Sequence, residues 1–107
     1  MPIKHPNLKL ARLTDAIPAW EGEIAPGDLH EICLQVRDGG GRLVALWGSD
    51  ARRENRGFLL HVVLINETGM VCLHVRLPAD QPVYPDISQI FPAASRMQRA
   101  TYDLLGI

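Results

Sequence analysis

The sequence predicts an α+β fold, a two-layer sandwich in which a mainly antiparallel sheet is covered by two helices. Two alternating, mostly apolar runs at 58–65 and 70–77 flank the sequence Asn-Glu-Thr-Gly at 66–69, which is typical of a β-hairpin turn. Segments 28–38 and 95–105 carry apolar residues at helical spacing along one face. One-faced helices and a sheet with an apolar face bury each other's apolar surface, and a chain of 107 residues has room for one such core.

The segment before the first helix has no sustained hydrophobic period and is interrupted by prolines at positions 2, 6 and 18. We therefore predict an irregular N-terminal arm over residues 1–25, with room for a short edge strand, and a folded domain over residues 26–107. Trp20 and Ile24 are expected to pack the arm onto this domain, because an exposed tryptophan is costly without a partner.

The first helix is expected over 28–38. Asp28 and Glu31 have the spacing of a capping box, in which two side chains bond the free amides of the first turn. The predicted buried stripe comprises Leu29, Ile32, Cys33 and Val36. The glycines at 39–41 should end the helix, since glycine enters the left-handed region freely. They do not predict a phosphate loop, which should follow a strand and open a helix.

The next predicted elements are a strand over 42–47, broken at 48–50, and a polar loop over 51–56. Arginines and carboxylates alternate through the loop and its approach: Asp50, Arg52, Arg53, Glu54 and Arg56. The arginines are able to bind an anion, but the interleaved carboxylates favour a solvated loop of mixed charge.

The predicted hairpin register pairs Asn66 with Gly69 and so sorts the side chains of both strands onto two faces. One face is wholly apolar and is the predicted core: Phe58, Leu60, Val62, Leu64, Val71, Leu73, Val75 and Leu77. The second face is too apolar for plain solvent and too polar for a core: Leu59, His61, Val63, Ile65, Met70, Cys72, His74 and Arg76. We therefore predict that the second face binds a partner.

On that face His61 lies opposite His74, with Cys72 two residues away on the same side. Two imidazoles and a thiol are ligands that zinc accepts, but three ligands do not complete a tetrahedral site, and no carboxylate stands nearby to support them. Hydrogen-bonded or interfacial histidines are the favoured interpretation. The alternative is a small metal- or ligand-binding domain that uses His61, Cys72 and His74, and a homodimer through this face is a third possibility.

Three prolines within 78–85 prevent a regular strand, and the last helix is predicted over 95–105. Ser95 and Gln98 have capping-box spacing. The predicted buried stripe of this helix is Met97, Ala100, Thr101, Leu104 and Leu105. Gly106 should end the helix, and the sequence stops one residue later, so we expect it to be a segment of a longer protein.

Composition and motifs argue against several function classes. Eleven basic and twelve acidic residues give a formal charge of −1, so the chain lacks the excess of positive charge that is typical of proteins that bind nucleic acid. No apolar run approaches the roughly 18 residues of a spanning helix, and the N-terminus lacks an apolar signal core, so neither membrane insertion nor export is expected. Cys33 and Cys72 fit no disulfide framework or cluster spacing. Serines stand in a turn, a linker and a cap, and carboxylates occur singly, so no catalytic site is predicted.

The C-terminal third carries a proline-rich stretch, then Phe-Pro, then a helix ending in Asp-Leu-Leu-Gly-Ile. The positions of this pattern are Pro82, Pro85, Phe91, Pro92, Ala94, Arg99, Asp103, Leu104, Gly106 and Ile107. The pattern resembles the thirty-kilodalton subunit of respiratory complex I, the NADH–quinone oxidoreductase or NADH dehydrogenase. Gln98 and Ala100 stand where that family has glutamates, so the partner contact made there should differ. In this respect the chain is closer to the related N-terminal domain of large subunits in membrane-bound NiFe hydrogenases, of the formate hydrogenlyase and hydrogenase-4 type.

The resemblance implies a scaffold without cluster, flavin or quinone of its own. It implies packing against the large subunit (49-kDa-like or NiFe) and the cluster-bearing small subunit, on the cytoplasmic side and peripheral to the inner membrane. Which complex the domain serves, and whether it counts as part of an enzyme, stays open. The expected partner-binding residues lie on the last helix and the second face of the hairpin: Arg96, Arg99, Tyr102, Asp103, His61, His74 and Arg76. Arg99 is expected to pair with a partner or, in the weaker orientation, with Asp103.

Overall fold

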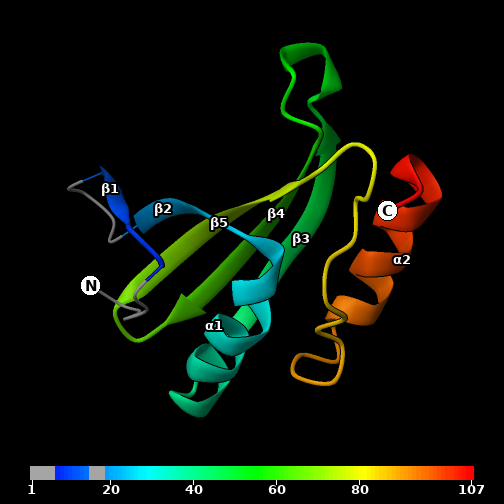
Figure 1. Cartoon of the computed structure of the whole chain (residues 1–107). Coiled ribbons are helices and arrows are strands. Elements are labelled where there is room, and N and C mark those ends of the chain that lie inside the picture. The colour runs from blue at the N-terminus through cyan, green and yellow to red at the C-terminus, as the bar shows by residue number, and fades with distance from the viewer. Residues whose placement is uncertain (1–6, 15–18) are drawn as a thin grey trace.

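The computed structural model describes residues 7–14 and 19–107 (Figure 1). In chain order the elements are β1 (Ala11–Thr14), β2 (Ala19–Ile24), α1 (Pro26–Asp38), β3 (Arg42–Asp50), the short 3-10 helix η1 (Arg52–Glu54), β4 (Phe58–Asn66), β5 (Gly69–Leu77) and α2 (Ala94–Leu105). The strands form one sheet in the order β1-β2-β5-β4-β3. The pairing is antiparallel except between β2 and β5, which run parallel.

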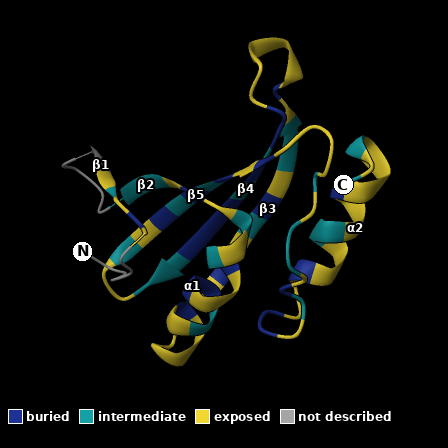
Figure 2. Cartoon of the chain, viewed as in Figure 1, coloured by how far each residue is buried: buried dark blue, intermediate teal, exposed yellow. Residues whose placement is uncertain are grey.

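The two-layer sandwich with a mainly antiparallel sheet is confirmed. Helix α1 packs against β4 and β5, and α2 packs against β3, so both helices cover the same face of the sheet (Figure 1). Buried residues gather on the central strands and on the side of α1 that faces the sheet, while the outer sides of both helices are exposed (Figure 2). The opposite face of the sheet is left without a covering layer among the described residues.

The predicted hairpin register is confirmed at every pair from Phe58 opposite Leu77 to Asn66 opposite Gly69. The turn is fixed by the Asn66 side chain, whose Oδ1 accepts hydrogen bonds from the amides of Thr68 (2.9 Å) and Gly69 (3.2 Å). All eight residues of the predicted core face are buried. Because side chains alternate along a strand, this one turn decides which residues face the helices and which face away.

Helix α1 has the predicted stripe, with Leu29, Ile32, Cys33 and Val36 all buried, but its predicted capping box is wrong. The helix begins two residues earlier, at Pro26, whose fixed φ and missing amide suit the first helical position. Asp28 therefore lies inside the first turn, where its carboxylate accepts a hydrogen bond from Asn7 Nδ2 at 3.2 Å. After Asp38 the chain turns through Gly40, at φ +82°.

The irregular arm expected over residues 1–25 lies in part outside the described residues, at 1–6 and 15–18; over 19–24 the structure differs from that expectation. Ala19–Ile24 is an internal strand whose neighbours are β1 and β5, and it directs Trp20, Gly22 and Ile24 to the covered face. Gly22 hides this alternation in the sequence. A Cβ there would lie 2.6 Å from the carbonyl oxygen of Lys9, because residues 8–10 cross over the strand. The expected packing of this segment is confirmed, since Ile24 is buried and Trp20 is half-buried.

Helix α2 has neither the predicted capping box nor the full predicted stripe. Gln98 bonds the preceding segment instead: its Oε1 accepts from the Ile87 amide (3.0 Å), and its Nε2 donates to Asp86 (2.9 Å). Thr101 is buried and donates to the carbonyl of Met97. Ala100 is exposed and Leu104 is 84% exposed, because the helix lies over β3 at the sheet margin and is covered on one narrow side only.

Gly48 permits the close approach of α2 to β3. The predicted strand break at 48–50 is wrong, since β3 continues to Asp50 with Gly48 opposite Leu60. A Cβ at Gly48 would lie 2.7 Å from Leu105 Cδ1 and 2.9 Å from Thr101 Cγ2. The glycine therefore makes room for the inner side of the helix.

We expect Gly48→Val to push α2 away from β3 and to lower the free energy of unfolding by about 1–3 kcal/mol, the usual cost of overpacking. Thermal and urea unfolding followed by circular dichroism measure this. Gly27→Ala is the matched control, because a Cβ at this second residue of α1 meets no atom within 4 Å. Wild-type stability of the Gly48 variant would show that α2 is not held against β3 in this way.

Candidate interaction surfaces

The uncovered sheet face is the first candidate surface. It is formed by the outward residues of four strands, among them Glu21, Glu23, Ala45, Trp47, Ser49, Leu59, His61, Val63, Ile65, Met70, Cys72, His74 and Arg76. Trp47 is 46% exposed and Met70 is 38% exposed on this face. Large apolar side chains beside half-buried polar groups are typical of a surface that contacts another protein.

A series of hydrogen bonds crosses this face through four strands. His74 Nε2 lies 3.2 Å from Glu21 Oε2, His74 Nδ1 lies 2.8 Å from His61 Nδ1, and His61 Nε2 lies 2.8 Å from Ser49 Oγ. The indole of Trp47 stacks on the His61 ring, with centroids 5.1 Å apart and planes 28° from parallel. The sequence prediction that His61 and His74 meet across the hairpin is thus confirmed.

The direction of these bonds follows from their one obligate acceptor. The Glu21 carboxylate accepts only, so His74 donates from Nε2, and a neutral His74 then accepts at Nδ1. His61 must donate from its own Nδ1, which leaves its Nε2 to accept from the Ser49 hydroxyl. Every ring nitrogen of the series is satisfied when both imidazoles are neutral. A proton added to either ring would force the bonds on one side of it to reverse.

Burial opposes such a proton. Desolvation, together with the neighbouring His74, lowers the pKa of His61 below its ordinary value of 6.5. Desolvation, together with Glu21, raises the pKa of the Cys72 thiol. His61 is therefore held neutral with both ring nitrogens hydrogen-bonded, and a neutral imidazole costs less to cover with a partner than a charged one would.

The structure does not assemble the alternative metal site. The Nδ1 atoms of His61 and His74 face each other at hydrogen-bond distance, and Cys72 Sγ lies 4.0 Å from His74 Nε2. Over residues 7–14 and 19–107, no group of three or more His, Cys, Asp or Glu side chains is placed to hold a metal ion. In the same described ranges, no helix is long and apolar enough to cross a membrane.

Sequence reasoning missed Glu21, Trp47 and Ser49 as neighbours of the histidines. Glu21 lies 53 positions before His74, on a strand whose pairing is not local, and Ser49 lies on the predicted strand break. The alternation of β3 beyond Gly48 was the one signal available, because it places Trp47 and Ser49 on the side of His61.

The outer side of α2 is the second candidate surface. Arg96, Arg99, Tyr102 and Asp103 are all exposed there, Tyr102 at 64%. The pair between Arg99 and Asp103 is not formed, and neither of these residues makes an ion pair within the described part of the chain. Arg76 lies apart from them on β5, where it bonds Glu23 at 3.0 Å. The structure therefore separates the predicted partner-binding residues into two surfaces.

Comparison with known proteins decides the family. Residues 23–107 match the family described as respiratory-chain NADH dehydrogenase, 30 Kd subunit. The chain belongs to this family. The resemblance read from the C-terminal pattern is confirmed, and the match also takes in the end of β2, upstream of the predicted domain boundary at residue 26.

Two curated relatives of the 30 Kd subunit domain come from different complexes. An NADH-quinone oxidoreductase subunit of Herpetosiphon aurantiacus is 33% identical over 60 residues, which are 56% of this chain and 33% of the relative. Formate hydrogenlyase subunit 5 of Escherichia coli is 34% identical over 71 residues, 64% of this chain and 12% of the relative. The chain thus spans a third or less of the length of either protein.

Solved structures share the fold. A trypsin-resistant fragment of Nqo5 superposes with a TM-score of 0.79 at 16% identity, covering 94% of this chain and 83% of the fragment. A chain of the membrane-bound sulfane sulfur reductase, an archaeal respiratory membrane complex, superposes with a TM-score of 0.82 at 19% identity, covering 95% and 61%. At these identities the likeness shows that the 30 Kd subunit fold is common to them.

The lowered pKa of His61 makes stability depend on pH. The unfolded chain takes up a proton on this histidine near pH 6.5, whereas the folded chain does so only at lower pH. The stabilisation is therefore present above about pH 6.5 and is lost as the pH falls through the folded-state pKa. We expect the melting temperature to fall between about pH 7.5 and 5.5, and to fall by a few degrees less in His61→Gln.

Differential scanning calorimetry at matched ionic strength measures this difference. His30→Gln, at an exposed position of α1, is the control and should keep the wild-type dependence. Identical slopes in His61→Gln and the wild type would show that the pair does not hold His61 neutral.

Proposed function

We propose that this domain is a non-catalytic docking module of a membrane-associated respiratory complex, either a complex I-like NADH–quinone oxidoreductase or a membrane-bound NiFe hydrogenase. It contacts the large subunit, 49-kDa-like or NiFe, and the cluster-bearing small subunit. Electron transfer takes place in these neighbours, and the domain contributes no cofactor. It is held at the cytoplasmic side of the membrane through its partners, without inserting.

The proposal rests on one observation: within the described residues, helices cover one face of the sheet and leave the other uncovered. The uncovered face presents Trp47 and Met70 beside two histidines that are hydrogen-bonded to each other, to Ser49 and to Glu21, so a partner can cover both rings without leaving a ring nitrogen unpaired. Family membership supports the same conclusion, because the curated relatives are named as subunits of an NADH-quinone oxidoreductase and a formate hydrogenlyase.

In this proposal the two surfaces contribute different kinds of contact to the partner. The uncovered sheet face supplies apolar area and shape through Trp47 and its neighbours. The outer side of α2 supplies Arg96 and Arg99, whose guanidinium groups are available for carboxylates of a partner. Contacts of this kind set orientation and specificity, while the apolar face supplies most of the affinity.

We expect Arg99→Glu to weaken co-purification with the large subunit while the melting temperature of the isolated domain stays within about 2 °C of wild type, as for surface changes in general. The reason is that Arg99 makes no ion pair within the described chain, so its replacement costs a partner contact and no internal one. Affinity pull-down from cells that express both subunits measures the first effect, and calorimetry measures the second.

Arg37→Glu is the matched control, because Arg37 is an exposed helix arginine on α1 whose side chain, among the described residues, bonds its neighbour Asp38. It should co-purify like wild type. A fall of many degrees in the melting temperature of Arg99→Glu would make the residue structural. Normal co-purification of a stable Arg99→Glu variant would show that this side of α2 is not part of the interface.

A further inference from the structure

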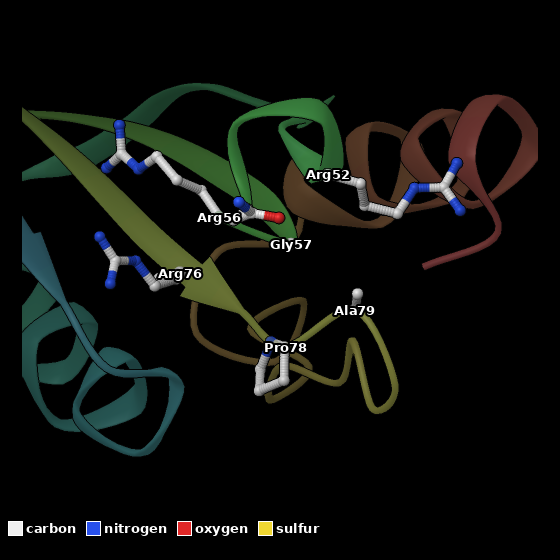
Figure 3. Close-up of a pocket in the computed structure, with 7 residues that line it drawn as sticks. Arg52, Arg56, Gly57, Arg76, Pro78 and Ala79 are labelled. Atoms are coloured by element: carbon white, nitrogen blue, oxygen red, sulfur yellow. The ribbon is translucent and has the colours of Figure 1, made fainter.

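A groove lined by arginines lies where the central strands of the sheet end, beside the uncovered sheet face, with which it shares Arg76. Because β2 and β5 run parallel, their C-terminal ends meet at this edge, next to the start of β4. A hollow of about 500 Å³ opens there, and its lining includes Arg52, Arg56, Gly57, Arg76, Pro78 and Ala79, which together we call the arginine groove. Figure 3 shows the guanidinium groups of Arg56 and Arg76 on one side of the hollow and that of Arg52 on the other, with Pro78 and Ala79 between them.

Backbone hydrogen bonds hold the wall of the groove formed by residues 51–57. The Ala51 amide bonds the carbonyl of Gly57 at 2.8 Å, and the carbonyl of Ala51 accepts from the amides of Glu54 and Arg56. Gly57 has φ +67°, and a Cβ there would lie 2.2 Å from the carbonyl oxygen of Leu77. The loop is thus closed on itself and seated against the end of β5, so the groove exists before any ligand arrives and binding would not need to order it.

The charges of the groove are only partly compensated. Arg56 and Arg76 share one carboxylate, Glu23, at 3.4 Å and 3.0 Å. Each guanidinium has five N–H donors, so most of those on this side remain open to another acceptor. Arg52 is held by both oxygens of Asp50 and lies over the Phe58 ring, 4.8 Å from its centroid. Arg52 of the predicted mixed-charge loop is therefore neutralised by Asp50. Arg56 of the loop and Arg76 of β5 share the single carboxylate of Glu23, so the excess of positive charge lies on their side of the groove.

A second hollow adjoins the first. That hollow measures about 650 Å³, shares Arg76 and Pro78 with the first, and extends along Glu23 and Ile24 to Asp28 in the first turn of α1. A long, open groove with a floor of proline and alanine fits an extended chain better than a small anion, which would contact one end only. Its positive end requires acidic side chains.

From these features we infer that the arginine groove binds an extended, acidic segment of a partner protein, with carboxylates on Arg56 and Arg76 and a small apolar residue over Pro78 and Ala79. The inference rests on the proposed function for the source of that segment, a subunit of the same complex. It adds a third contact, next to the uncovered sheet face and sharing Arg76 with it.

The first test uses a fluorescent peptide of about six alternating glutamate and alanine residues, long enough to span about 20 Å when extended. We expect it to bind the chain at low salt, to bind less at higher salt, and to bind about tenfold more tightly than the same peptide with glutamine in place of glutamate. Arg56→Ala combined with Arg76→Ala should lower the affinity about tenfold, while Arg37→Ala should leave it unchanged.

If the double variant does not fold, Ala79→Glu serves instead, because it places a carboxylate on the exposed floor of the groove and removes no arginine. Equal binding of the glutamate and glutamine peptides would overturn the inference. Binding unaffected by the groove variants would do the same, and so would tighter binding of a single-stranded oligonucleotide of equal charge.

The second test separates this inference from the proposed function. A photo-crosslinker attached at Ala79→Cys, in a chain that also carries Cys72→Ser so that only the introduced thiol is exposed, should label an acidic segment of a neighbouring subunit in the assembled complex. If the complex assembles normally but the crosslinker labels no acidic segment, the proposed binding of such a segment by the arginine groove is wrong, while the docking role is unaffected. Binding of the acidic peptide by a chain that never co-purifies with respiratory subunits would reject the docking role and leave the groove intact.

Discussion

The register of the β4–β5 hairpin is the constraint on which the rest of the structure depends. With Asn66 opposite Gly69, eight apolar side chains face the helices and the two histidines face away. A slip of one residue would exchange the two faces, burying His61 and His74 under α1 and exposing the core. The Asn66 side chain bonds two amides of the turn and thereby opposes that slip.

The uncovered face follows from this register and from the strands on either side. The parallel strand β2 brings Glu21 to His74, and the continuation of β3 past Gly48 brings Ser49 and Trp47 to His61. The resulting hydrogen bonds run in one direction when both imidazoles are neutral, ending at the Glu21 carboxylate. Another protein can cover the two rings without leaving a ring nitrogen unpaired, which connects the local chemistry to the docking role proposed for the domain.

The parts of the fold that depend on local pattern were predictable. The hairpin, its two faces and the stripe of α1 follow from alternation, from the turn at 66–69 and from helical spacing. Strand β2 was not, because its pairing with β5 is distant in sequence and Gly22 interrupts its alternation. The two predicted capping boxes do not form. Helix α1 begins earlier than predicted, at Pro26, and Gln98 of α2 bonds Asp86 and the Ile87 amide instead of the start of its own helix. The histidine pair was predicted, whereas Glu21 could be placed beside it only by the tertiary fold.

The central claim, that another protein of the same complex covers the open sheet face, is tested most directly by the reactivity of the two cysteines. Cys72 lies part-exposed on that face, while Cys33 is buried on the inner side of α1, where desolvation raises its pKa to about 12. In the free chain, alkylation followed by mass spectrometry should therefore modify Cys72 and spare Cys33. In the complex purified with the large and small subunits, we predict that the Cys72 rate falls at least about tenfold, the change expected when opening of the interface must precede reaction. An unchanged rate at Cys72 in the intact complex would contradict the account.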